Sequence, residues 1–139
     1  MRKFIISIDA GTTSNRSILF DLKGNPVFSS KKEFTQYFPK SGWVEQDPDE
    51  IWRTTVITLK DVIQKAKKLR GKILNIGITN QRETTVLWDK RTGKPVYNAI
   101  VWQDRRQEEF CAKLRKQNKD TMIFNKTCLL YTSDAATRS

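Results

Sequence analysis

Two short polar stretches contain residue types that could bind phosphate and hydroxyl groups. The first, residues 9–16, reads Asp-Ala-Gly-Thr-Thr-Ser-Asn-Arg. Asp9, at the end of a predicted strand, could hold Mg²⁺ mostly through water, and Gly11 would let an anion approach the backbone. Four neighbours could donate hydrogen bonds to phosphate oxygens: Thr12, Thr13, Ser14 and Arg16. An ordinary hairpin with glycine in its turn is the alternative, and the sequence contains no P-loop signature.

The second stretch, residues 79–85, reads Thr-Asn-Gln-Arg-Glu-Thr-Thr and follows another predicted strand. Arg82 donates hydrogen bonds and Glu83 accepts them, so the pair could bracket the vicinal hydroxyl groups of a polyol. Polar residues at the carboxyl end of a strand often face a ligand in an open α/β sheet, although a solvated turn is the alternative. Trp102 could form an apolar wall beside the carbon chain of such a ligand, or it could pack in the core.

Hydrophobic patterning predicts the elements that would position these stretches. A three-stranded antiparallel meander is predicted from three β-rich segments separated by turns: residues 3–9, 17–21 and 27–34. A helix is predicted to begin at its cap Asp47 and to be stopped by Gly71, and a further strand covers residues 73–79. Three strands, a helix and a returning strand indicate the start of an RNase H-like α/β domain with a mixed sheet.

The predicted helix carries apolar residues at spacings of three and four, which indicates one buried stripe. Its members are Ile51, Trp52, Val56, Leu59, Val62, Ile63 and Ala66. Trp52 is therefore expected in the core. Further along the chain, a turn signal at residues 89–93 favours a hairpin of 85–88 with 94–97, and residues 105–116 have helical character.

Composition limits the size and the class of the protein. Its 139 residues are enough for one domain, and the net charge of +11 comes from 26 Lys and Arg against 15 Asp and Glu. These charges are spread along the chain, which favours a solvated surface over a nucleic-acid-binding face. The absence of histidine excludes a Ser-His triad within this chain. No segment reaches the ~20 apolar residues of a membrane span, and a cytoplasmic setting is expected.

Four strings of the sequence carry a family resemblance, and together they extend over about residues 3–127. They lie at residues 9–16, 42–48, 77–85 and 93–103. They resemble the glycerol kinases, a family within the FGGY carbohydrate kinases. The most specific strings are Asn-Gln-Arg-Glu-Thr-Thr and Asn-Ala-Ile-Val-Trp-Gln, whereas the Asp-x-Gly-Thr turn is shared more widely with sugar kinases and actin-like ATPases.

The resemblance implies ATP-dependent phosphorylation of glycerol to sn-glycerol 3-phosphate, with Mg²⁺ as the cofactor. It implies that Asp9 helps to hold Mg²⁺ and that Trp102 packs against the glycerol carbons. It assigns the nucleotide phosphates to Thr12, Thr13, Ser14 and Arg16, and the glycerol hydroxyl groups to Arg82 and Glu83. One departure is Ala10, because many members of the family have glutamine at this position.

The resemblance also implies an incomplete RNase H-like (actin-like ATPase) N-terminal domain. Residues 1–127 are expected to form this partial domain, and residues 128–139 are expected to be a non-native tail that resembles a translated transposon-end adapter. The general base of the family, an aspartate, and the second domain would lie outside this chain. The isolated chain is therefore expected to be inactive, and the complete parent protein is expected to be a homo-oligomer.

Three alternatives remain at this stage. A kinase for another polyol or sugar would share the fold, although Arg82, Glu83 and Trp102 argue against it. A basic nucleic-acid-binding RNase H-like module would use the positive charge, but a nuclease would need a cluster of carboxylates and only Asp9 is available. An actin-like structural ATPase would not need the site around Arg82 and Glu83.

Overall fold

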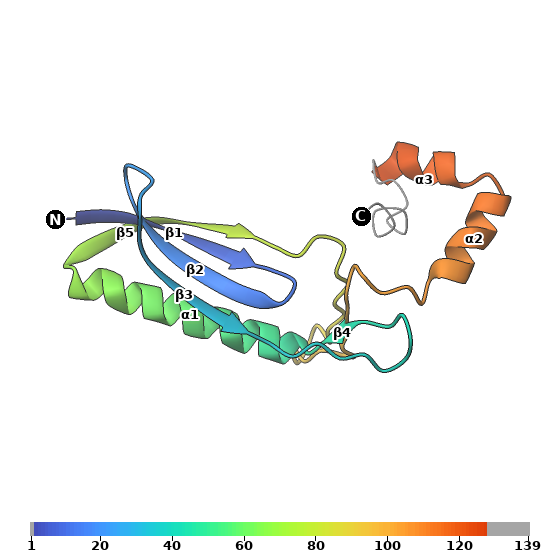
Figure 1. Ribbon diagram of the computed structural model, residues 1–139, viewed down its shortest axis with the longest axis horizontal. Helices are drawn as coiled ribbons and strands as arrows, with labels where there is room; N and C mark the ends of the chain where they lie inside the picture. Colours follow the sequence, from blue (N-terminus) through green and yellow to red (C-terminus); the bar gives the residue numbers. More distant parts are fainter. Residues whose placement is uncertain (1, 128–139) are drawn as a thin grey trace.

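A mixed four-stranded sheet with a long helix along one face forms the body of the computed structural model, which describes residues 2–127 (Figure 1). Strands β1 (Arg2–Ala10), β2 (Ser14–Asp21) and β3 (Pro26–Glu33) form an antiparallel meander. Strand β5 (Gly71–Thr79) returns after the helix and pairs in parallel with β1, so the order is β3-β2-β1-β5. The predicted meander and the returning strand are confirmed.

Helix α1 (Pro48–Lys68) begins as predicted but ends for a different reason. The carboxylate of Asp47 accepts a hydrogen bond of 2.9 Å from the Asp49 amide, which caps the first turn. At the other end Arg70, with φ of 51°, takes the left-handed conformation that Gly71 was predicted to supply. Gly71 instead begins β5, and a Cβ atom there would overlap the ring of Phe4. The glycine therefore serves close packing and not helix termination.

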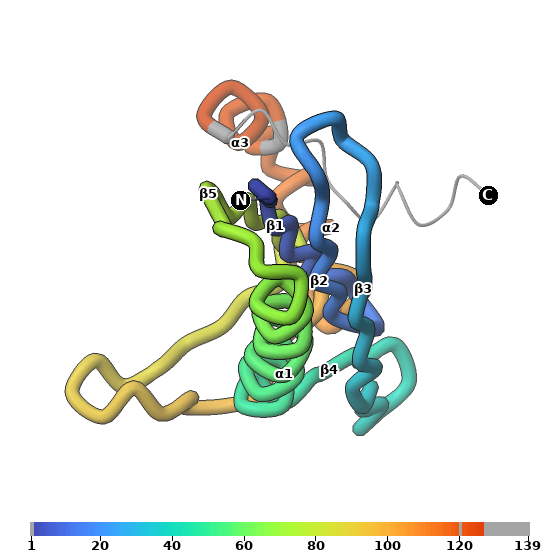
Figure 2. Tube along the Cα trace, turned by 90° about the vertical axis from the view of Figure 1, so that its left-hand side faces the viewer, coloured from blue at the N-terminus to red at the C-terminus, as the bar shows by residue number. Residues whose placement is uncertain are grey.

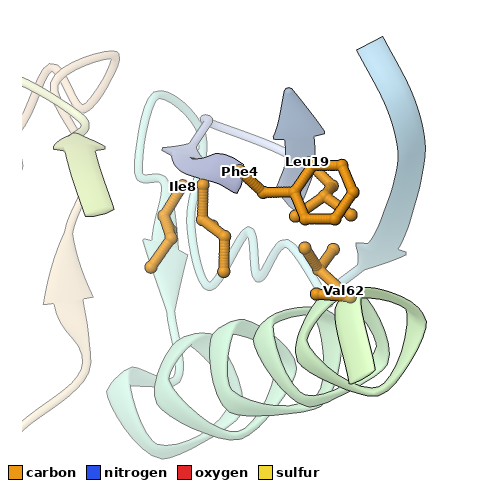
Figure 3. Packing of buried hydrophobic residues seen from close by; sticks show 6 residues of the cluster. Phe4, Ile8, Leu19 and Val62 are labelled. Atoms are coloured by element: carbon orange, nitrogen blue, oxygen red, sulfur yellow. The ribbon is translucent and has the colours of Figure 1, made fainter. Parts of the chain in front are cut away.

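The core lies between α1 and the sheet, where β1 contributes Phe4, Ile6 and Ile8 (Figure 3). The fully buried face of α1 has a strict spacing of four: Thr54, Thr58, Val62 and Ala66. The prediction that Trp52 is in the core is wrong, because its side chain is 69% exposed. Two residues correspond to about 200° around a helix, so Trp52 points away from the sheet when Thr54 points toward it.

The two buried threonines of α1 are explained by polar partners on β2. Asn15 donates from Nδ2 to the Thr54 hydroxyl and to the Ile51 carbonyl, each at 2.8 Å. The hydroxyl groups of Ser17 and Thr58 lie 2.9 Å apart, and Thr58 also donates to the Thr55 carbonyl at 3.0 Å. The helix is therefore held to the sheet by polar contacts near the turn between β1 and β2 and by apolar packing further along.

Smaller elements complete the described part of the chain. Strands β4 (Glu45–Gln46) and β6 (Ala99–Ile100) pair antiparallel beyond the sheet. The predicted turn at 89–93 is confirmed by a 2.9 Å bond from the Asp89 amide to the Lys94 carbonyl, but the arms form isolated bridges and not strands. This segment extends sideways from the body (Figure 2).

Helices α2 (Glu108–Lys116) and α3 (Asp120–Thr127) lie beyond the loop end of the sheet (Figure 1). Helix α2 falls inside the predicted helical stretch. The expected tail, residues 128–139, lies outside the described residues. Over residues 2–127, no helix is both long enough and apolar enough to cross a membrane.

Candidate functional site

The two polar stretches meet because the strands that precede them end side by side. In the parallel pairing of β1 with β5, Asp9 is the Cα partner of Thr79. The turn after β1 and the loop after β5 therefore leave the sheet at the same edge. Carboxyl ends of neighbouring parallel strands are a common place for ligand sites in α/β proteins.

A pocket of about 370 Å³ opens at this edge. Its lining comes from the turn, the loop and one tryptophan: Asp9, Ala10, Gly11, Thr12, Asn80, Gln81, Arg82, Glu83 and Trp102. The structure thus brings five of the eight predicted site residues into one pocket. The other three, Thr13, Ser14 and Arg16, are not in its lining. Ser14 and Arg16 lie within β2, which begins three residues earlier than predicted.

The turn between β1 and β2 is tight and is closed by a backbone bond of 3.0 Å from the Gly11 amide to the Ser14 carbonyl. A Cβ atom at Gly11 would lie 3.0 Å from that same carbonyl oxygen, so glycine suits this position best. A turn of this kind presents amide and hydroxyl donors around a small concavity, which fits a phosphate group.

The carboxylate of Asp9 is exposed at the rim of the pocket. Within residues 2–127, no group of three or more His, Cys, Asp or Glu side chains could hold a metal ion. These residues would fit Mg²⁺ only as an ion that takes most of its ligands from water and from phosphate oxygens. Mg²⁺ in nucleotide sites commonly has such a ligand set.

Glu83, which lines the pocket, has a strained backbone. Its φ is 65°, a left-handed conformation that costs a residue other than glycine about 1 kcal/mol or more. Its neighbour Arg82 lines the same pocket, and both side chains are exposed. Strained residues of this kind cluster at functional sites, so Glu83 is a stronger candidate than its sequence alone indicated.

Trp102 lies in the pocket wall with 38% of its surface exposed. Its indole Nε1 donates a hydrogen bond of 3.1 Å to the Thr12 hydroxyl. Because that N–H is already used, the indole offers a ligand its carbon surface and not a donor. Of the two predicted possibilities, the geometry favours the apolar wall over the core.

Comparison with known proteins identifies the family. The model of the N-terminal domain of the FGGY family of carbohydrate kinases matches residues 4–137. The chain belongs to the FGGY family of carbohydrate kinases. This FGGY domain is 57% identical over 129 residues to the glycerol kinase of Malacoplasma penetrans, covering 93% of the chain and 25% of the relative. It is 54% identical over 130 residues to the glycerol kinase of Petrotoga mobilis, covering 94% and 26%.

Solved structures confirm the predicted actin-like ATPase fold and show that the chain is a partial FGGY domain. Plasmodium falciparum glycerol kinase with ADP superposes with a TM-score of 0.80 at 38% identity, covering 88% of the chain and 25% of that structure. Gluconate kinase from Lactobacillus acidophilus gives a TM-score of 0.81 at 26% identity, covering 90% and 25%. The chain spans about a quarter of the length of the curated relatives it matches.

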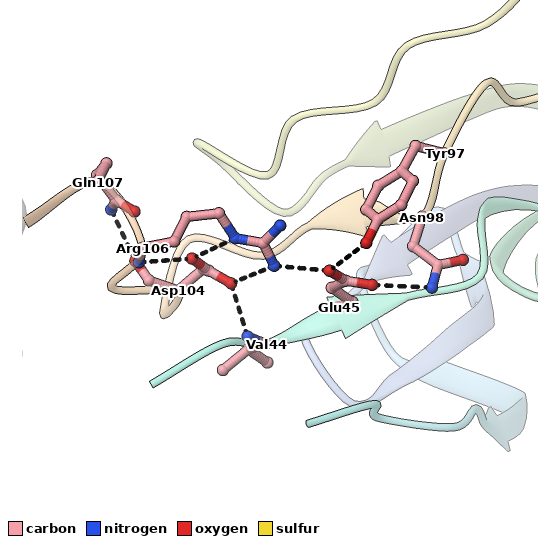
Figure 4. Close-up of polar contacts among 7 residues, drawn as sticks. All are labelled: Val44, Glu45, Tyr97, Asn98, Asp104, Arg106 and Gln107. Atoms are coloured by element: carbon pink, nitrogen blue, oxygen red, sulfur yellow. Dashed lines mark hydrogen bonds and ion pairs between the residues drawn. The ribbon is translucent and has the colours of Figure 1, made fainter. Parts of the chain in front are cut away.

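An ionic cluster of Glu45, Asp104 and Arg106 joins β4 to the segment that follows Trp102, and sequence reasoning missed it (Figure 4). The guanidinium of Arg106 lies 2.7 Å from the Glu45 carboxylate and 2.8 Å from that of Asp104. It also stacks 3.8 Å from the ring centroid of Trp43. Glu45 lies in one of the family strings, and Asp104 and Arg106 follow directly after another, but nothing in their spacing indicated that they would meet.

Hydrogen bonds keep the ionic cluster charged in spite of its burial. Burial alone would raise the pKa of the Glu45 carboxyl, but bonds from Arg106, Asn98 and Tyr97 hold this pKa below its usual range. Burial opposes ionisation of Asp104 too, and bonds from Arg106 and from the Val44 amide lower its pKa overall. In turn, the hydrogen bond to Asp104 is the main reason that the Arg106 pKa is raised. The FGGY domain thus holds residues 104–106 against β4 with three full charges at neutral pH.

Proposed function

We propose that this chain forms part of a glycerol kinase, which transfers the γ-phosphoryl group of ATP to glycerol and yields sn-glycerol 3-phosphate. The observation that carries the proposal is that Arg82, Glu83 and Trp102 line the same pocket as Asp9 and Thr12. Glycerol has vicinal hydroxyl groups for an adjacent donor and acceptor, and a short carbon chain for the indole surface.

In this reaction a hydroxyl oxygen of glycerol attacks the γ-phosphorus, the bond from phosphorus to the bridging oxygen breaks, and ADP leaves. The hydroxyl proton passes to a carboxylate base that we place outside this chain. Arg82 donates to one glycerol oxygen and Glu83 accepts from a neighbouring hydroxyl group, so the pair orients the attacking group. Such positioning, together with charge stabilisation, supplies most of the catalysis in phosphoryl transfer.

The nucleotide phosphates are assigned to the turn after β1. Donors from Thr12, Thr13 and Ser14 would cradle them, and Arg16 would add a charged fork from β2. Mg²⁺, when bound, neutralises phosphate charge, and Asp9 would hold it from the end of β1. Because ATP is the donor, we place the reaction in the cytoplasm, and we propose a homo-oligomeric complete enzyme with no nucleic-acid partner.

A kinase for another sugar is the second candidate, because kinases named for gluconate and xylulose share the fold. Their identity to this chain is 26%, whereas the solved glycerol kinase of Plasmodium falciparum reaches 38% over a similar share of the chain. This difference supports glycerol as the substrate.

A substrate panel on the complete kinase tests the proposal, with glycerol, xylulose and gluconate as acceptors for Mg-ATP. We expect glycerol to have the highest kcat/KM. Arg82→Met and Glu83→Gln should each raise the glycerol KM by about 10-fold or more, since a hydrogen bond to a charged group contributes about 1.5–3 kcal/mol. Arg91→Met, in the exposed turn at 89–93, is the matched control. A preference for xylulose or gluconate would reject glycerol as the substrate.

A further inference from the structure

Thr12 accepts hydrogen bonds on its hydroxyl group from Trp102, which lines the pocket, and on its carbonyl group from side-chain amides that lie outside the pocket lining. Its hydroxyl oxygen accepts from the Trp102 indole at 3.1 Å, which leaves the hydroxyl proton free to donate to a phosphate oxygen. Its backbone carbonyl accepts from the side-chain amide of Gln46 at 2.7 Å and from that of Gln36 at 3.2 Å. A residue assigned to phosphate is thus held through its hydroxyl group by a residue assigned to the polyol.

Gln46 continues this connection into the loop that carries Arg82. Its Oε1 accepts from Nε2 of Gln81 at 3.0 Å, and the Oε1 of Gln81 accepts from the Thr84 hydroxyl at 3.0 Å. The Nε2 of Gln46 also donates to Oε1 of Gln36 at 2.7 Å. We call the path from Gln81 through Gln46 to the Thr12 carbonyl the amide link.

The amide link has a fixed direction. A backbone carbonyl can only accept, so the NH₂ group of Gln46 must point at Thr12 and its oxygen must point at Gln81. Gln46 is completely buried, and its position in the two-residue strand β4 is held by pairing with Ala99 of β6. A buried network with every partner in place has one strongly preferred arrangement, so a shift of the Gln81 loop must also act on the turn.

We infer that Gln46 is a positioning residue that couples the polyol loop to the phosphate turn, an inference that rests on the proposed function. When a polyol engages Arg82 and Glu83, it restrains the loop that contains Gln81. The amide link then fixes the Thr12 carbonyl, while Trp102 fixes the Thr12 hydroxyl. The polyol should therefore tighten nucleotide binding, and by linkage the nucleotide should tighten polyol binding by the same factor.

The test measures this factor in the complete kinase by titrating a non-hydrolysable ATP analogue with and without saturating glycerol. We expect glycerol to tighten the analogue by about 5-fold or more, within the usual range for coupled sites. Gln46→Met keeps the volume and the apolar burial but removes the amide link, and should bring the ratio clearly closer to one, with the bonds from Trp102 and Gln36 to Thr12 still in place. Gln81→Met breaks the amide link at its half-buried end and should lower the ratio in the same way. This variant keeps the test possible if the Gln46 variant fails to fold.

Thr58→Val is the matched control, because it removes a buried hydrogen bond between α1 and β2 that is not part of the amide link, and it should leave the ratio unchanged. A folded Gln46→Met or Gln81→Met protein with the parent ratio would overturn the inference. A parent protein that phosphorylates glycerol without any tightening would also overturn it while leaving the proposed function intact. A parent protein that does not accept glycerol would overturn both.

Discussion

At the scale of single residues, Glu83 combines a proposed role in polyol binding with a left-handed backbone conformation that costs free energy. Its left-handed φ of 65° would suit glycine better, yet we propose that its carboxylate binds the polyol in the pocket that it lines. Function and stability are therefore opposed at one residue, as is common where strain persists.

This opposition gives the first prediction. Glu83→Gly should change the free energy of unfolding by no more than about 1 kcal/mol, because relief of strain offsets the added freedom of the unfolded chain. The same change should raise the glycerol KM of the complete kinase. Arg70→Gly is the control, since Arg70 has a similar φ of 51° and lies at the opposite end of β5 from the pocket. It should keep the parent KM, and a raised KM in both variants would mean that the carboxylate is not the cause.

At the scale of elements, β5 packs against β1 through a residue without a side chain. Gly71→Ala should destabilise the fold by about 1–3 kcal/mol, because the new methyl group would collide with the buried ring of Phe4. Gly77→Ala, on the same strand, meets nothing within 4 Å and should cost much less. Urea unfolding of both variants measures the difference, and equal midpoints would disprove this account of Gly71.

The ionic cluster predicts how stability depends on pH. The pKa values of Glu45 and Asp104 are lower in the folded state than in the unfolded chain, whose carboxyl groups titrate near ~4. The unfolded state therefore binds more protons in this range. The ionic cluster thus stabilises the folded state fully above about pH 4, and this stabilisation is lost as the pH falls through the folded pKa values.

Urea midpoints at several pH values between 7 and 3 provide the measurement. Asp104→Asn should lower the midpoint at pH 7 and flatten the fall toward pH 3. Asp61→Asn is the control, because this carboxylate bonds to Ser30 outside the ionic cluster. If Asp104→Asn keeps the steep fall of the parent protein, the ionic cluster is not its source.

The sequence predicted elements better than it predicted contacts between them. The strands and α1 were recoverable because apolar periodicity marks them directly, and the pocket was foreseeable because both polar stretches follow strand ends. The placement of Trp52 failed because the predicted apolar stripe of seven residues is broad, and its pattern does not specify which edge of the stripe faces the sheet. Thr54 was missed because its burial depends on Asn15 of another strand. Gln46 was missed because a buried amide leaves no periodic signal.

At the scale of the whole molecule, the chain spans about a quarter of the length of the curated relatives it matches. We expect no glycerol-dependent ADP release from the isolated 139-residue chain, because we propose that the catalytic base lies outside it. A coupled assay with Mg-ATP and glycerol measures this, with the complete kinase as the positive control. Turnover by the chain at a rate near that of the complete kinase would show that its own residues suffice.

The outer edge of β5 has a consequence for how this chain behaves at high concentration. Across residues 2–127, β5 is the last strand of the sheet, and Ile76 and Ile78 are 49% and 73% exposed. An open edge with apolar side chains can pair with its own copy, and a two-fold axis would let two such edges align antiparallel. Sedimentation at rising concentration should show dimers or larger species, and Ile78→Lys should suppress them, because a charged edge residue opposes pairing. The strand that leads into the loop of Arg82 and Glu83 thus also limits the concentration up to which the isolated chain stays monomeric.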